Sequence, residues 1–291
     1  PMPDQADQRR ERVRETLVLA GGSPAGYVAL AGSSVGVGVT TLATSVAQQL
    51  ASLGARTLIV DANLARPALG SRLGVAASAD LHAVLAGRRR VTEATVPAPF
   101  GSAVICAKPD PLDQPPQGES LERLVRELRA AAERFDAILV DVGAELTPWG
   151  DRICRSSSEI LLAGSVRPDD VRSAYALVKS FGGRHRVRLA LRGSWEAAGA
   201  VARKIGETAL QYAGVDPLVH PPAVLVPGND KAAQAERRTA CRLLAAELLA
   251  PMRIAHQRRP RTSRDPGRRL AAAREVDPHP ADDAPTLSWR P

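Results

Sequence analysis

Short apolar runs alternate with helical stretches along most of the chain, and this alternation limits the possible folds more than any other feature. The apolar runs lie at residues 27–32, 56–61, 102–107, 136–141, 159–166 and 186–191. Helical patterns lie at about residues 40–53, 119–134, 168–181, 195–212 and 230–249. Strands that are apolar on both faces and alternate with helices form a parallel sheet covered on both sides. The sequence therefore predicts an α/β domain with a doubly wound, mostly parallel sheet.

Polar segments flank this domain at both ends. Residues 1–24 read as a charged helix and a linker, because apolar positions are few and glycines and a proline follow. Residues 25–250 form the predicted α/β domain, and Pro251 is expected to end its last helix. Residues 251–291 are rich in Arg, Pro, Asp and Ala, so we expect a basic tail without a core of its own.

The positive charge of the chain is concentrated in that tail. Of the net charge of +8, the stretch 253–274 contributes +7, from eight arginines and one acid. A domain that is basic throughout, as expected for many nucleic-acid-binding proteins, is therefore excluded. No aromatic residues interleave with these arginines, which argues against binding of single-stranded nucleic acid. The run is expected to be a solvated tail, and the alternative is a segment attracted to an anionic membrane surface or, less favoured, to nucleic acid.

The cysteines and the distribution of apolar residues indicate in which cellular compartment the protein is expected. The three cysteines are scattered without metal-ligand spacing, and neither an apolar signal segment nor a transmembrane run is present in the sequence. We therefore expect a cytoplasmic protein, with a peripheral position at the inner face of the membrane as the alternative. No metal site is expected from side chains alone, and the five histidines are isolated.

A glycine-rich turn follows the first predicted strand and precedes a helix. A phosphate-binding loop needs glycines for close backbone approach, a helix N-terminus, a lysine for phosphate charge and a hydroxyl for Mg²⁺. Gly36, Gly38 and Thr40 supply the glycines and the hydroxyl. The lysine position is Val39, and Ser33 stands where the pattern begins with glycine. The turn predicts a phosphate-binding loop that lacks the positively charged lysine side chain.

Two further motifs follow the glycine-rich turn along the chain, each at the end of a predicted strand. A strand ends in Asp61-Ala62-Asn63, and another ends in Asp141-Val142-Gly143. With the glycine-rich turn, these motifs make residues 27–248 resemble the MinD/ParA group of P-loop ATPases. Within that group, the segments 140–147 and 166–179 and the N-terminal Asp4-Gln5-Ala6 motif are most similar to the FlhG-type (YlxH) flagellar-number regulators.

A second branch of the group remains an alternative. The segment DANLARP at residues 61–67 is also similar to the bacterial tyrosine kinases of polysaccharide export. Those kinases usually end in a tyrosine cluster, whereas the tyrosines here are Tyr27, Tyr175 and Tyr212. The absence of tail tyrosines favours the FlhG-type resemblance.

The resemblance implies a nucleotide site and also shows what that site lacks. The residues that match nucleotide-binding positions are Ser34, Gly36, Val37, Gly38, Val39, Thr40, Thr41, Asp61, Asp141 and Gly143. In the group, a second signature lysine falls at Ser34, and an acid tied to the attacking water falls at Asn63. No adenine-contacting Asn follows the strand at 186–191. Each positioned electrostatic group in phosphoryl transfer is typically worth about 10³-fold.

The combined losses predict a degenerate ATPase. Asp61 and Asp141 are expected to be vestigial Mg²⁺-site acids, so no catalytic residue is expected. ATP or ADP with Mg²⁺ through Thr40 would bind weakly. The usual nucleotide-dependent dimer is left open, because it depends on the residue that is Ser34 here.

The N-terminal motif implies a partner. In FlhG-type proteins this helix engages an FlhF-type GTPase, and Asp4, Gln5, Ala6 and Arg10 match the motif, while Arg9 replaces its apolar position. The sequence thus predicts a regulator of flagellum number or placement that acts by binding proteins. The alternatives are an active MinD/ParA-type ATPase switch and a polysaccharide-export kinase-like ATPase.

Overall fold

A computed structural model describes residues 27–257 of the chain, except 76–80, 109–115, 117, 145 and 216–230. All described residues lie in the unit that ends at Arg258. The predicted N-terminal helix and the tail beyond residue 257 lie outside this part, and the boundaries predicted at residues 24 and 250 stay predictions. Within the described residues, no helix is both long and apolar enough to cross a bilayer.

In the described part of the chain, seven strands form one sheet with the order β3-β4-β2-β5-β1-β6-β7. All neighbouring pairs are parallel except β3 with β4. The strands are β1 (Val28–Gly32), β2 (Thr57–Asp61), β3 (Val96–Pro97), β4 (Ala103–Ile105), β5 (Ala137–Gly143), β6 (Glu159–Ser165) and β7 (Arg186–Arg192). The predicted doubly wound, mostly parallel α/β sheet is confirmed.

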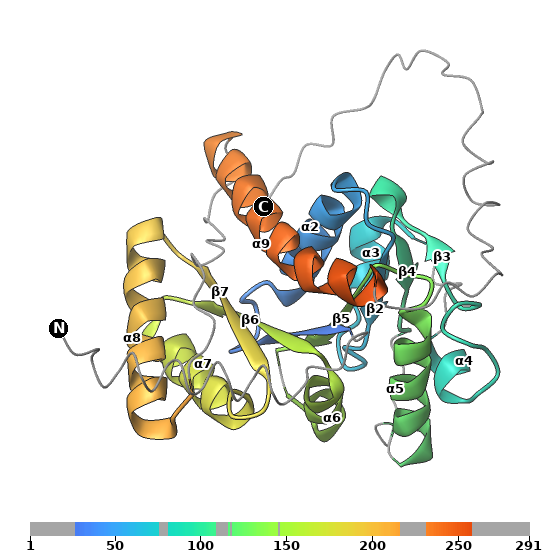
Figure 1. The fold of residues 1–291 in the computed structure, drawn as a ribbon, viewed down its shortest axis with the longest axis horizontal. Coiled ribbons are helices and arrows are strands. Elements are labelled where there is room, and N and C mark those ends of the chain that lie inside the picture. The colour runs from blue at the N-terminus through green and yellow to red at the C-terminus, as the bar shows by residue number, and fades with distance from the viewer. Residues whose placement is uncertain are drawn as a thin grey trace. The chain divides into compact units, whose positions relative to one another are not determined.

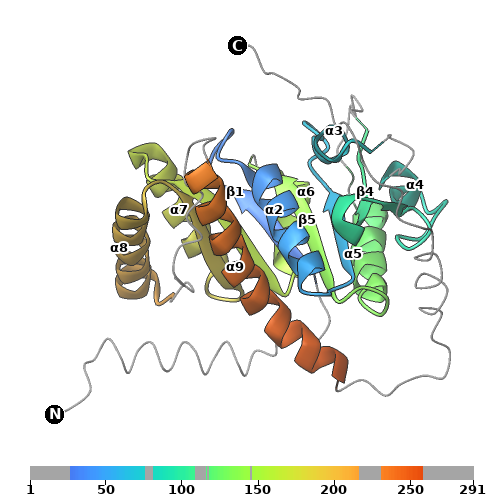
Figure 2. The same ribbon diagram turned by 90° about the horizontal axis from the view of Figure 1, so that it is seen from above.

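Helices cover both faces of this sheet (Figures 1 and 2). The helices are α2 (Val39–Ser52), α3 (Leu69–Leu73), α4 (Leu81–Leu85), α5 (Glu119–Ala131), α6 (Pro148–Ser156), α7 (Pro168–Phe181), α8 (Trp195–Ala213) and α9 (Lys231–Gln257), with a 3₁₀ turn at Pro99–Gly101. One face carries α2 and α9, which pack side by side (Figure 2). The other face carries α5, α6 and α7 (Figure 1).

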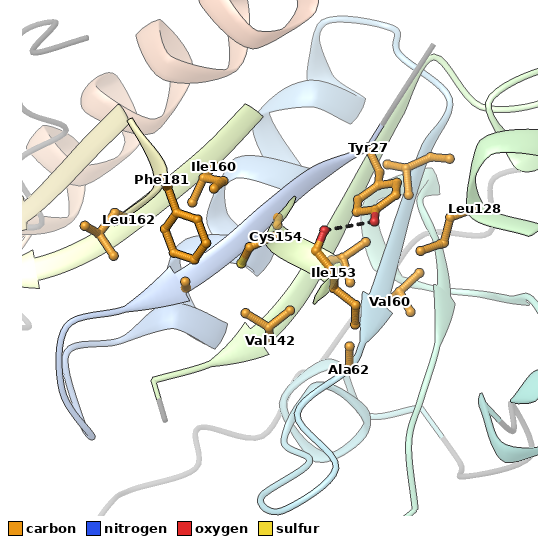
Figure 3. Close-up of a cluster of buried hydrophobic side chains, with 14 of the residues drawn as sticks. Tyr27, Val60, Ala62, Leu128, Val142, Ile153, Cys154, Ile160, Leu162 and Phe181 are labelled. Atoms are coloured by element: carbon orange, nitrogen blue, oxygen red, sulfur yellow. Dashed lines mark hydrogen bonds between the residues drawn. The ribbon is translucent and has the colours of Figure 1, made fainter. Parts of the chain in front are cut away.

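Residue alternation along β1 produces these two layers. Val28 and Leu30 belong to the core under α2 and α9. Tyr27 and Ala29 belong to the core under α5, α6 and α7. Figure 3 shows this second core, where the Tyr27 hydroxyl donates a 2.9 Å hydrogen bond to the carbonyl of Ile153. Successive strand residues face opposite sides, so a central strand must be apolar throughout.

The last helix corrects one prediction. We expected Pro251 to end it, but α9 continues to Gln257. A proline inside a helix removes one backbone hydrogen bond and strains the preceding turn, yet the residues on both sides can still continue the helix. The prediction was wrong because a proline kinks a helix as well as ending it.

A buried charge cluster joins α9 to the sheet. Arg188 of β7, which is 4% exposed, forms ion pairs with Glu159 of β6 and, at 2.5 Å, with Glu247 of α9. Burial raises the pKa of Glu159, and the nearby charges of Arg188 and Arg186 oppose that shift. This cluster fixes α9 against the strands beside the apolar contacts of Leu244 and Leu248.

The Arg188→Met variant should therefore lose about 3–5 kcal/mol of unfolding free energy, because it leaves a buried glutamate without its counter-charge. Urea denaturation at pH 7 measures this loss. Arg172→Met is the control, since Arg172 and its partner Asp169 are both exposed and such pairs contribute little. Equal effects of the two substitutions would contradict the proposed role of the cluster.

Candidate functional site

The glycine-rich loop occupies the carboxyl end of the central strand. β1 ends at Gly32 and α2 begins at Val39. Gly36 and Gly38 have φ angles of 84° and 99°, a left-handed conformation that glycine adopts without strain. The turn thus brings backbone amides to the N-terminus of α2, where the helix dipole favours an anion. This is the place in open α/β sheets where ligands usually bind.

The residue at the lysine position packs into the protein. Val39 is 5% exposed and Val37 is 2% exposed, and both belong to the core under α2. A Cβ atom at Gly32 would lie 2.7 Å from Cγ2 of Val39 and 2.9 Å from Cβ of Ala144. Gly32 is therefore required for the approach of these side chains. Apolar packing occupies the position from which a lysine would reach a phosphate.

Thr40 and Asp141, the residues predicted for a Mg²⁺ site, lie close enough for the Thr40 hydroxyl to influence the Asp141 carboxyl group. Asp141, at the end of β5, is fully buried, and its Oδ1 accepts a 2.9 Å hydrogen bond from the Gly143 amide. Its Oδ2 has no hydrogen-bond partner among the described residues. Burial raises the pKa of Asp141, and the Thr40 hydroxyl and the Gly143 amide partly offset this. A buried carboxylate oxygen without a hydrogen-bond partner is the type of oxygen ligand that Mg²⁺ prefers.

Asp61 has a structural role that the motif did not reveal. Its Oδ2 accepts 2.9 Å hydrogen bonds from the amides of Ala68 and Leu69, and its Oδ1 accepts one of 3.3 Å from the Asn63 amide. These bonds hold residues 62–69 in their turn. Burial raises the pKa of Asp61 to about 7, with a smaller contribution from the charge of Asp141.

The neighbouring position Asn63 lies against the end of β5. Its Nδ2 is 2.6 Å from the point where a Cβ of Gly143 would lie, so Gly143 leaves room for the amide. Asn63 Oδ1 accepts a 3.2 Å hydrogen bond from the Arg66 amide. An amide cannot supply the negative charge of the acid that stands here in the MinD/ParA group, which the sequence resembles.

The loop is tied to α7 by a polar network. Ser34 Oγ donates a 2.5 Å hydrogen bond to Oδ1 of Asp170, whose other oxygen accepts hydrogen bonds from Ser165 and, at 3.1 Å, from Arg167. Asp170 is 1% exposed, whereas the Arg167 side chain is 70% exposed. Burial by itself would raise the pKa of Asp170, but the three hydrogen-bond donors outweigh it and hold that pKa below its usual value.

The structure brings most of the predicted site residues to one edge of the sheet. The predicted loop residues follow β1; they are Ser34, Gly36, Val37, Gly38, Val39, Thr40 and Thr41. The other three lie at the ends of the two strands on one side of β1: Asp61 on β2, and Asp141 and Gly143 on β5. Their role in nucleotide binding stays a prediction. Asp4, Gln5, Ala6 and Arg10 lie outside the described residues, as do the side chains of the arginine run.

Two contacts at this edge of the sheet were not predicted. Asp170 contacts Ser34 across 136 positions of sequence, and no local pattern reports such a contact. Trp149 donates a 2.8 Å hydrogen bond from Nε1 to the carbonyl of Ala62, which fixes the turn after β2 against α6. Among the described residues, no cluster of three or more His, Cys, Asp or Glu side chains could hold a metal ion.

Comparison with known proteins agrees with this fold. No model of a known protein family matches the chain. The antiactivator FleN of Pseudomonas aeruginosa is 26% identical over 210 residues, which are 67% of this chain and 74% of FleN. The cell division ATPase MinD of Pyrococcus furiosus has a TM-score of 0.53 at 20% identity and covers 76% of this chain and 99% of its own.

A ParA family ATPase from Chlorobium tepidum TLS has a TM-score of 0.54 at 18% identity and covers 81% of this chain and 100% of its own. The predicted resemblance to the MinD/ParA group, with an FlhG-type relative, is confirmed. The similarity to the solved structures concerns the fold.

The raised pKa of Asp61 predicts a pH-dependent stability. The group has an ordinary pKa of 3.8 and a folded pKa of about 7, so its contribution is fully present below about pH 4 and is lost as the pH rises through 7. Compared with Asp61→Asn, the native chain should lose up to about 4 kcal/mol of unfolding free energy between pH 4 and pH 8. Chemical denaturation across this range measures the difference, and Asp169→Asn is an exposed control. Parallel curves for the native chain and Asp61→Asn would refute it.

Proposed function

We propose that this chain, a relative of FleN with the fold of the MinD/ParA ATPases, is a regulator of flagellum number or placement that acts by binding proteins and does not hydrolyse ATP. The observation that carries the proposal is the buried Val39 in the lysine position of the loop. The sequence relationship to the antiactivator FleN supports the regulatory part.

The loss of hydrolysis follows from what the site residues can and cannot do. The Val39 side chain packs against Gly32 and cannot neutralise a phosphate. Asn63 cannot bear the charge that holds the attacking water in the family, and Ser34 is bound to Asp170. Three missing groups, each typically worth about 10³-fold, leave little catalysis.

Weak nucleotide binding is compatible with this proposal. The amides at the start of α2 can approach phosphates, and Thr40 with Asp141 Oδ2 would hold Mg²⁺. The ion would neutralise part of the phosphate charge when bound. The same pair favours the second candidate function, an ATPase switch in which nucleotide controls partner binding.

A calorimetric titration of Mg²⁺-ATP, with an assay of phosphate release, tests the nucleotide part. We expect release at the background rate and binding that is at least about tenfold tighter in Val39→Lys, because the amine restores the phosphate contact. Val46→Lys, which also buries an amine on α2 but far from the loop, controls for charge and damage. Turnover by the native chain at the rate of ordinary ATPases of this fold would refute the proposal.

The partner is proposed to be an FlhF-type GTPase that binds the N-terminal helix. Deletion of residues 1–20 removes Asp4, Gln5, Ala6 and Arg10 and should abolish binding to the purified GTPase in a pull-down and by calorimetry. Deletion of residues 275–291 from the opposite end is the control and should leave binding unchanged. Undiminished binding after the N-terminal deletion would contradict the docking role of this helix.

A further inference from the structure

The side chain of Asp170 accepts hydrogen bonds from polar groups beside the glycine-rich loop. Its carboxylate accepts the only proton that the Ser34 hydroxyl can donate. It also accepts hydrogen bonds from Nε of Arg167 at 3.1 Å and from Nη2 at 3.4 Å. The Ser34 hydroxyl and two nitrogens of the Arg167 guanidinium, which could donate to a phosphate, are thus hydrogen-bonded to an internal acid.

The position of Asp170 places its charge beside the loop. Asp170 lies in the first turn of α7, and β6, which leads into that helix, pairs with β1. The Ser33 amide donates a 2.8 Å hydrogen bond to the Ala163 carbonyl, so the loop begins against β6. The carboxylate is 1% exposed, and little water screens it. Arg167 offsets only part of this charge, from the solvent side, where the guanidinium is mostly exposed.

We propose that Asp170 suppresses nucleotide binding, because its carboxylate withholds Ser34 and Arg167 from the phosphates and repels them. This inference rests on the proposed function and adds a residue that lowers the affinity of the same site. Because Val39 replaces a lysine, the loop lacks one positive charge that would attract phosphates. Asp170 in addition competes with the phosphates for the hydrogen-bond donors Ser34 and Arg167. Asp170 would then hold the loop through the hydrogen bond from Ser34, in the place of contacts with a nucleotide.

The test compares Mg²⁺-ATP binding by calorimetry in the full chain and its variants. Asp170→Asn keeps the shape of the side chain but removes the charge, and it should bind Mg²⁺-ATP roughly tenfold more tightly than the native chain. Asp170→Ser should do the same if the asparagine variant folds poorly. Asp170→Glu keeps the charge and should remain weak. Circular dichroism verifies the fold of each variant.

The matched control is Asp169→Asn. Asp169 precedes Asp170 on the same turn, but it is exposed and pairs with Arg172. Removing its charge should leave the affinity unchanged. The double variant Asp170→Asn with Arg167→Gln should lose most of the gain, because the released guanidinium contributes to it.

Two results would overturn the inference. One is native affinity, or no detectable binding, in both Asp170→Asn and Asp170→Ser. The other is an equal gain in Asp169→Asn, which would reduce the effect to net charge. These results differ from failure of the proposed function, which would appear as rapid ATP hydrolysis by the native chain.

Discussion

The close approach between Gly32 and the valines of the loop is the constraint on which the candidate site depends. A side chain at Gly32 would meet Val39, Val37 and Ala144 at 3.0 Å or less. The last residue of β1 must therefore be a glycine, and the chain turns back over the sheet onto α2. Apolar contacts and the Ser34–Asp170 hydrogen bond then give the loop its shape. In this account the loop needs no phosphate to be ordered.

The fold was largely predictable because its signals are local. Buried strands on both faces of a sheet are short continuous apolar runs, and each predicted run became a strand. α5 has Leu121, Leu124, Val125 and Leu128 on one face, a helical spacing that is visible in the sequence. The shorter elements were missed, including the nine-residue helix α6. α3 and α4 have five residues each, too few for a period to appear, and β3 is a two-residue edge strand.

The residues of the site were predictable only where they belong to a sequence motif. Glycines with a following threonine, and acids at strand ends, indicated which residues meet at the edge of the sheet. The roles of individual side chains depended on tertiary contacts. Asp61 orders a turn through three backbone amides, which its motif does not report. Asp169 and Asp170 are adjacent acids in the sequence, yet Asp170 is buried against the loop and Asp169 is exposed.

The most direct test of the account is hydrogen–deuterium exchange of residues 33–42 in the full chain, with and without saturating Mg²⁺-ATP. If the protein's own contacts order the loop, the amides of Ser33 and Leu42, which bond to Ala163 and Gly38, should exchange slowly without nucleotide. Nucleotide should change their rates little. Rapid exchange in the free chain, with strong protection on adding Mg²⁺-ATP, would show that nucleotide orders the loop and would contradict the account.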